Sequence, residues 1–233
     1  METSSIREEA RFHLQGRWGM AILVTFLASV LGGLILNSGS ANFDFDEETL
    51  RRLPEVVRSY LLIAASFGAT LGVIQFVIGG TIRLGYCKFL LNLHDGGNAD
   101  IKDLFSQFPR FAEAFLLSLL SAIYTFLWTL LFIIPGIVAT YKYAMAPFIL
   151  LENPGLSAKD AITESKEMMR GHKMDLFCLQ LSFIGWAILS ALTLGIGNFW
   201  LNPYMNMSYA VFYRRLQEPV YPVSEPVIDP SMI

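Results

Sequence analysis

The sequence predicts an all-α fold: a polytopic transmembrane helical bundle of six spans, paired as three hairpins, with amphipathic helices at the membrane interface. Hydrophobic residues make up 54% of the 233 residues and charged residues only 16%, and the mean hydropathy is +0.47. Charge is therefore scarcer than in an ordinary soluble domain. The apolar residues also gather in runs without Asp, Glu, Lys or Arg, and these runs reach the roughly 20 residues that cross a bilayer as a helix.

Two of these runs are too long for a single crossing, because a helix rises about 1.5 Å per residue and the hydrocarbon core is about 30 Å thick. The run at 114–141 contains Pro135 followed by Gly136, a pair that ends one helix and turns the chain. The run at 176–213 contains the letters GIGN at 195–198, which predict a second break. The predicted spans are residues 18–36, 60–82, 114–134, 137–151, 176–194 and 199–213.

The distribution of Lys and Arg around these spans predicts the topology, because cytoplasmic loops carry an excess of both residues. With the N-terminus inside, thirteen lie in cytoplasmic segments and three in outer loops. The thirteen are Arg7, Arg11, Arg17, Arg83, Lys88, Lys102, Arg110, Lys159, Lys166, Arg170, Lys173, Arg214 and Arg215, and the three are Arg51, Arg52 and Arg58. Residues 1–216 are thus expected to form one domain in the plasma membrane, with both termini cytoplasmic and 217–233 as a flexible tail. One kinked helix over 114–151 is the alternative, but it would place four of these cations outside.

Polar groups inside the spans are candidates for a polar interior or a lipid headgroup site, because such groups are rare in membranes and usually face a polar partner. Lys142 has two interpretations: its long stem reaches the outer headgroups, or it points inward, where Asn202 and Tyr204 lie at a similar depth. A weak internal repeat relates residues 81–96, 139–154 and 203–216 and places Arg83 within one position of Lys142. The candidate residues are Arg83, Lys142, Asn202 and Tyr204.

Small and amphipathic patterns predict how the helices pack. Ala64, Gly68 and Gly72 recur at four-residue spacing, which lets helix backbones approach closely in membranes. Residues 4–18, 101–108 and 157–169 alternate apolar and polar side chains with a helical period, so we expect three short helices at the interface.

Four stretches of the sequence resemble the bacterial integral membrane family called domain of unknown function 975. They are REEARFHLQGRW, LFIIPGIVATYKYAMAPFIL, AITESKEMMRGHKMDLFCLQLSFIGWAIL and GIGNFWLNPYMNMSYAVFYRRL, and together they cover about residues 7–216. The resemblance implies a multi-pass membrane protein of Gram-positive type bacteria. It implies no catalytic residues.

The sequence argues against catalysis and nucleic-acid binding. It contains no HExxH or GxSxG motif, and Cys87 and Cys178 lack the spacing of a metal or disulfide framework. His13 and His94 are interpreted as an interfacial side chain and a loop residue. We therefore expect no enzyme activity, no cofactor and no metal. The net charge of −3, without a basic block, makes nucleic acid an unfavourable partner.

These observations favour a non-catalytic membrane protein of the bacterial cell envelope. Its expected partners are the lipid bilayer and, as an accessory module, anionic lipid or other membrane proteins. The alternative is a transporter or permease component for a small solute, lipid or peptide.

The charge asymmetry makes a direct prediction about topology. A membrane-impermeant thiol reagent is expected to modify Asp46→Cys in intact cells and to leave Lys166→Cys unmodified until the membrane is opened. The unsubstituted chain, with Cys87 and Cys178, gives the background labelling. The opposite pattern would overturn the predicted orientation.

Overall fold

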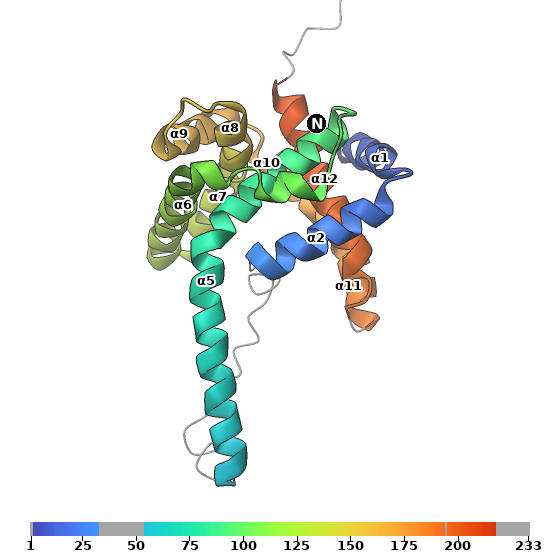
Figure 1. Cartoon of the computed structure of the whole chain (residues 1–233). Coiled ribbons are helices and arrows are strands. Elements are labelled where there is room, and N and C mark those ends of the chain that lie inside the picture. Colours follow the sequence, from blue (N-terminus) through green and yellow to red (C-terminus); the bar gives the residue numbers. More distant parts are fainter. Residues whose placement is uncertain (1, 33–53, 194, 218–233) are drawn as a thin grey trace, which may run out of the picture.

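The computed structural model describes residues 2–32, 54–193 and 195–217 (Figure 1). Within these ranges every regular element is a helix, so the predicted all-α class is confirmed. In chain order the elements are α1 (Thr3–Leu14), α2 (Trp18–Gly32), α5 (Glu55–His94), the 3₁₀ helices η1 (Ile101–Phe105) and η2 (Phe108–Arg110), α6 (Phe111–Leu131), α7 (Ile133–Lys142), α8 (Ala146–Glu152), α9 (Ala158–Met168), α10 (Lys173–Leu181), α11 (Ile184–Leu192) and α12 (Asn198–Gln217).

Four segments of the described chain are long and apolar enough to cross a membrane. They are Gly72–His94, Ile101–Leu131, Ile134–Glu152 and Lys173–Leu192. The pair α1 and α2 meets the same criterion when the two are taken together, although they meet at an angle of 101°. The predicted span at 199–213 lies in α12 and is not among the four, because Asn202, Asn206 and two terminal arginines lower its hydropathy.

The helix that contains the second predicted span, 60–82, continues well beyond residue 82. It is α5, which runs to His94, and among its described residues Gly72–His94 is apolar enough to cross a membrane. Nothing in the sequence after Arg83 breaks a helix until the turn at Gly96, whose φ of 73° suits glycine. Arg83 therefore lies inside α5, at an exposed position, and the N-terminal half of the helix projects away from the other helices (Figure 1).

The chain turns between α6 and α7 three residues earlier than predicted. Phe132 is extended, with φ −160° and ψ 146°, and Pro135 falls in the first turn of α7, where a missing N–H costs no hydrogen bond. The two helices run antiparallel, since the Tyr124 and Tyr143 rings are 6.1 Å apart and a Cβ on Gly136 would meet the Thr129 side chain at 2.2 Å. One kinked helix across 114–151 is therefore not observed.

The predicted break at 195–198 is present, because α11 ends at Leu192 and α12 begins at Asn198. Gly195 has a φ of 86°, a conformation that glycine adopts without strain. Across this turn a Cβ on Gly197 would lie 2.9 Å from Ser190, so the turn brings the two backbones into close contact.

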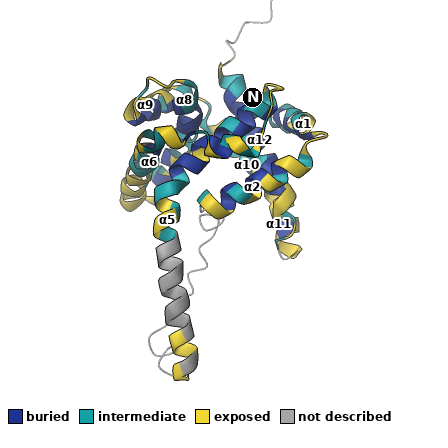
Figure 2. Ribbon diagram, in the orientation of Figure 1, coloured by how far each residue is buried: buried dark blue, intermediate teal, exposed yellow. Residues whose placement is uncertain are grey.

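The core lies where the C-terminal half of α5 meets α8 and α12 (Figure 2). Its large, fully buried side chains include Phe89 of α5, Ile149 and Leu150 of α8, and Phe212 and Tyr213 of α12. The rings of Phe148 and Tyr213 stack with centroids 5.0 Å apart. Each of these three helices contains part of one of the segments that the weak internal repeat relates.

Large apolar side chains are exposed far from this core, along α6 and at both helix turns (Figure 2). Leu130, Ile134 and Leu192 are 74%, 76% and 76% exposed. Monomeric soluble proteins rarely expose apolar patches of this kind, so the distribution fits helices that face lipid.

Two of the three predicted amphipathic helices are present. In α1 the apolar residues Ile6, Ala10 and Leu14 are fully buried against the bundle, and α9 begins at Ser157, whose side chain accepts a hydrogen bond from the backbone N–H of Asp160. The prediction for 101–108 is wrong in type, because this segment forms η1 and the start of η2. A proline at 109 disfavours the α conformation of the residue before it.

Close helix contacts of α5 are described at glycines that lie C-terminal to the predicted small-residue face. Among the described residues nothing lies within 4 Å of a Cβ built on Gly72. The surroundings of Ala64 and Gly68 are not among those that the structure describes. A Cβ on Gly80 would instead meet the Ala114 carbonyl oxygen at 2.6 Å, and one on Gly85 the Leu104 carbonyl oxygen at 2.2 Å.

We expect Gly85→Ala to lower the melting temperature of the protein in detergent, because the added methyl group collides with backbone that cannot move freely. Overpacking of this kind costs about 1–3 kcal/mol. Gly72→Ala, in the same helix, is the matched control: alanine has the higher helix propensity and meets no neighbour, so its melting temperature should be unchanged or raised. Equal melting of the two variants would contradict the close contact.

Candidate functional site

Two arginines of α1 converge on one hydroxyl group of α12. Arg7 and Arg11 are four residues apart and so lie on the same face of the helix. Their Nε atoms donate to the Tyr204 hydroxyl at 3.4 and 3.2 Å, and this hydroxyl donates to the Arg7 backbone carbonyl at 3.1 Å. Tyr204 is 8% exposed. The contacts hold α1 on α12 and direct both guanidinium groups to one place.

Neither guanidinium group has an acidic partner within the described part of the chain. Arg7 lies over the Phe183 ring, with its Cζ 5.4 Å from the centroid, and Arg11 lies over the Tyr204 ring at 5.6 Å. By contrast, Arg214 and Arg215 both form ion pairs with carboxylates. Two like charges four residues apart repel each other, so an anion placed near Arg7 and Arg11 would be favourable.

Arg11 also stands at the rim of a cavity of about 310 Å³ between the α1–α2 junction and the α11–α12 turn. The cavity is within the range typical of small-molecule sites. Its lining is mostly apolar or aromatic and consists of Arg11, Trp18, Trp186, Leu189, Ser190, Thr193, Gly197, Trp200, Leu201 and Tyr204. Tryptophan is enriched where a membrane meets water, because its ring is apolar and its N–H is polar.

The cavity can therefore hold an amphiphile. Guanidinium groups recognise phosphate with paired hydrogen bonds, and the tryptophan and leucine walls offer contacts to a hydrocarbon chain. The residues that line the cavity thus offer one cation and an apolar wall, which is an arrangement that suits binding.

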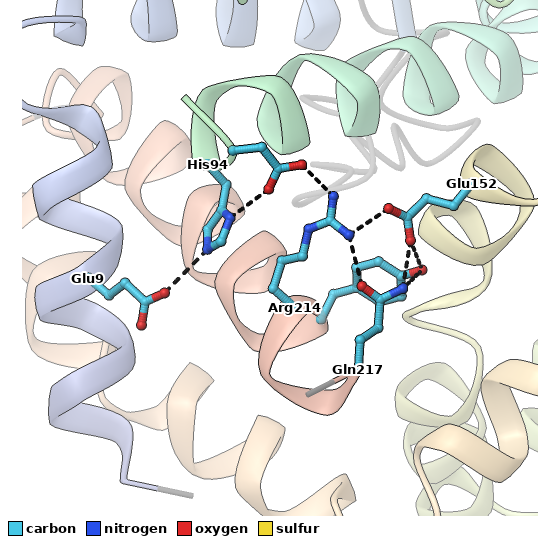
Figure 3. A network of polar contacts seen from close by, with 7 residues as sticks. Glu9, His94, Glu152, Arg214 and Gln217 are labelled. Atoms are coloured by element: carbon cyan, nitrogen blue, oxygen red, sulfur yellow. Dashed lines mark hydrogen bonds and ion pairs between the residues drawn. The ribbon is translucent and has the colours of Figure 1, made fainter. Parts of the chain in front are cut away.

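A second polar cluster joins the ends of three core helices (Figure 3). Arg214 of α12 donates to the Asp95 carboxylate at 2.5 Å and to the Glu152 carboxylate at 2.6 Å. The Tyr213 hydroxyl also donates to Glu152, at 2.7 Å. Burial lowers the pKa of Arg214, but its hydrogen bonds to Asp95 and its interaction with Glu152 outweigh this and raise the pKa above its ordinary value.

The cluster continues to α1. Glu9 accepts from Arg215 at 2.5 and 3.0 Å and contacts His94 Nε2 at 3.2 Å, while His94 Nδ1 lies 2.9 Å from Asp95. Burial raises the pKa of Glu9, but the hydrogen bonds with Arg215 and His94 outweigh it and leave the pKa below its usual value. The His13 ring stacks on His94 with centroids 4.4 Å apart. Burial and the neighbouring His94 lower the pKa of His13.

A family model described as a protein of unknown function, DUF975, matches residues 1–141 and 129–219, which is nearly the whole chain. The chain belongs to the DUF975 family. The resemblance inferred from the four sequence stretches is thus confirmed. No curated protein and no solved structure matches this DUF975 protein, so the site must be interpreted from its own geometry.

Of the four residues predicted for a polar site, the structure places only Tyr204 at the cavity. The Lys142 ammonium lies over the Trp128 ring, 5.3 Å from its centroid, and Asn202 accepts a hydrogen bond from the Asn206 side chain through its backbone carbonyl. Arg83 is exposed on α5. Within the described residues no hydrogen bond joins the Lys142 side chain to Asn202 or Tyr204, so the predicted inward pairing is not observed.

Sequence reasoning missed Arg7 and Arg11 because their partner, Tyr204, is 197 and 193 residues away. One local signal was available. Two arginines at four-residue spacing on an amphipathic helix, without acids at the same spacing on the same face, indicate a cationic strip.

The ion pairs of Arg214 give a testable difference in stability. Arg214→Met leaves Asp95 and Glu152 without their shared partner, and we expect a loss of about 1–3 kcal/mol of folding free energy, since hydrogen bonds to charged groups are the stronger ones. Arg170→Met removes an exposed pair with Glu167, whose side chains are 78% and 62% exposed, and should cost less than about 1 kcal/mol. The measurement is thermal melting in detergent at constant salt; equal shifts would contradict the central role of Arg214.

Proposed function

We propose that this DUF975 protein is a non-catalytic multi-pass protein of the bacterial plasma membrane that binds an anionic lipid in the cavity beside α1. The headgroup phosphate contacts Arg7 and Arg11, and the acyl chain lies against the tryptophan walls. One observation carries the proposal: two guanidinium groups without acidic partners among the described residues converge on Tyr204, which lines an apolar cavity together with Arg11.

The placement of charge supports a single orientation in the membrane. The ion pairs of Glu9, Asp95, Glu152, Arg214 and Arg215 gather segments that are all expected in the cytoplasm. The turns at Phe132 and 195–198 carry exposed apolar residues instead. In this proposal α2 and α12 complete a six-span bundle of three hairpins, both termini are cytoplasmic, and the cationic strip on α1 faces the inner leaflet. Anionic lipids are abundant on that side of many membranes.

Selectivity in this site comes from the headgroup rather than the chain. An acyl chain leaves one apolar environment for another, so its burial in the cavity gains packing but little hydrophobic free energy. The phosphate, by contrast, gains two guanidinium partners close to an apolar wall, where water competes less for the charge. Removing the positive charges should therefore reduce binding of anionic lipid and leave neutral lipid unaffected.

Lipid co-purification tests this directly. The variant Arg7→Gln with Arg11→Gln is expected to retain about tenfold less anionic phospholipid than the wild type, because one lost charge-assisted hydrogen bond of about 1.5 kcal/mol corresponds to that factor. The matched control is Lys159→Gln with Arg170→Gln, which removes two exposed cations elsewhere. Bound lipid is extracted from protein in mild detergent and quantified by mass spectrometry. Equal retention in both double variants would overturn the proposal.

A further variant separates this site from the one that the sequence pattern suggested. Lys142→Met should leave anionic lipid retention unchanged, because its ammonium lies over Trp128 and away from the cavity lining. A large loss in Lys142→Met, with Arg7 and Arg11 intact, would move the lipid site to α7. Lipid movement in proteoliposomes made from the wild type would favour the transporter alternative over a binding module.

A further inference from the structure

Three potential metal ligands converge where α1 meets the end of α5, on the opposite flank of α1 from Arg7 and Arg11. Glu9 and His13 lie four residues apart on one face of α1, and His94 is the last residue of α5. One ligand atom from each of the three lies within 4.8 Å of the others. Figure 3 shows Glu9 and His94 directed toward each other.

The His94 ring faces a carboxylate oxygen at both of its nitrogens. Nδ1 lies 2.9 Å from Asp95 Oδ1, and Nε2 lies 3.2 Å from Glu9 Oε1. A neutral imidazole has one N–H only, so donation to Asp95 leaves the Nε2 lone pair directed at a carboxylate oxygen. Two lone pairs in contact repel each other. A second proton on Nε2 or a metal ion bound by both atoms removes the repulsion.

The position of His13 favours the metal ion. A second proton on His94 would satisfy both carboxylates and would need nothing from His13. Yet the His13 ring lies against His94, with centroids 4.4 Å apart, and among the described residues it makes ring contacts but no hydrogen bond. A neutral imidazole in this position is a third ligand ready for a cation between Glu9 and His94.

The surroundings hold two of the ligands, Glu9 and His94, in the orientation that coordination requires. Asp95 accepts from His94 Nδ1, which is the carboxylate–histidine–metal arrangement that fixes a ligand's tautomer. Arg215 binds the other carboxylate oxygen of Glu9, Oε2, and leaves Oε1 directed at His94. Asp95 is itself held by Arg214. A hydrogen bond between Glu9 and a doubly protonated His94 would not require these supporting groups.

We propose that Glu9, His13 and His94 bind one divalent transition-metal ion of the zinc class, which fastens α1 to the end of α5. Two imidazoles and one carboxylate suit such ions, whereas Mg²⁺ and Ca²⁺ prefer oxygen ligands alone. The side chains of Glu9 and His94 are 31% and 17% exposed, so water can reach the ion and fill the remaining coordination position. The three ligands are not among the residues that line the proposed lipid cavity.

Zinc binding to purified protein tests the inference. Protein with its affinity tag removed is stripped with a chelator, and Zn²⁺ is titrated by calorimetry with the metal content measured after dialysis. We expect one ion per chain in the wild type. His13→Ala is expected to weaken binding more than about 100-fold, because loss of even a supporting group near a metal costs about 10–100-fold. No binding to the wild type above background would overturn the proposal.

The chain supplies its own control in His172, its third histidine. His172 Nδ1 contacts Asp175 and does not belong to the described cluster, so His172→Ala should bind zinc as the wild type does. Equal loss in His172→Ala and His13→Ala would overturn the site. The double variant of Arg7 and Arg11 keeps all three ligands and should still bind one zinc ion per chain, whereas His13→Ala should not, which separates this site from the lipid cavity.

Melting curves test whether the variants are folded, so that loss of zinc binding is not mistaken for unfolding. His13→Ala removes no hydrogen bond among the described residues, so its melting temperature in chelator should match the wild type within a few degrees. Zinc should then raise the melting temperature of the wild type and of His172→Ala, because a ligand that binds only the folded state stabilises it, and should not raise that of His13→Ala. Equal stabilisation of all three by zinc would sink the proposal.

Discussion

The contact on which the rest of the fold depends is the bridge that Arg214 makes between Asp95 and Glu152. Helices α5 and α8 end at His94 and Glu152, and α12 ends three residues after Arg214. The C-terminus of a helix carries a partial negative charge, so three such ends and two carboxylates in one place repel one another. Arg214 and Arg215 supply the positive charge that lets them meet, with hydrogen bonds of 2.5–2.6 Å.

This meeting point divides the molecule into two parts with different surfaces. Toward it, side chains such as Phe89, Ile149 and Phe212 are almost fully buried in protein. Away from it, the helices diverge and expose Leu130, Ile134 and other large apolar residues. In water this arrangement would be costly, but in a bilayer the exposed residues face hydrocarbon. In the proposed membrane arrangement, the polar network and the apolar turns are complementary parts of one architecture.

Features that depend on local sequence patterns are predicted well, whereas features that depend on contacts between distant residues are predicted poorly. The all-α class, the break at 195–198 and the cap at Ser157 follow from local patterns, and each is present. Hydropathy gave no sign that the helix of the second predicted span extends to His94, because hydropathy falls at Arg83, whereas a helix continues until a residue such as Gly96 ends it. The turn at Phe132 was assigned to Pro135 for a related reason: proline is compatible with the first turn of a helix as well as with its end.

The candidate sites show the same difference between local patterns, which the sequence reveals, and long-range contacts, which it does not. Tyr204 was selected from the sequence as a partner for Lys142 at a similar depth, and the structure places it at the cavity while the Lys142 ammonium lies over Trp128. The partners of Tyr204 could not be selected, because they lie on α1, nearly 200 residues earlier, and no local pattern encodes that pairing. Glu9 and His94, likewise, are 85 residues apart, a separation that hides a ligand cluster from any search for closely spaced motifs.

Helix α1 is where these long-range relations combine, because its 3.6-residue period sorts its side chains into three strips. Ile6, Ala10 and Leu14 form the buried strip, with Arg7 and Arg11 along one flank and Glu9 and His13 along the other. Both flanks reach their partners on α12 and α5 only when the buried strip is docked. Two ligands that each bind the docked state must favour each other, because the coupling between two sites is reciprocal. An anionic lipid at one flank and a metal ion at the other would therefore bind with positive cooperativity, without any direct contact between them.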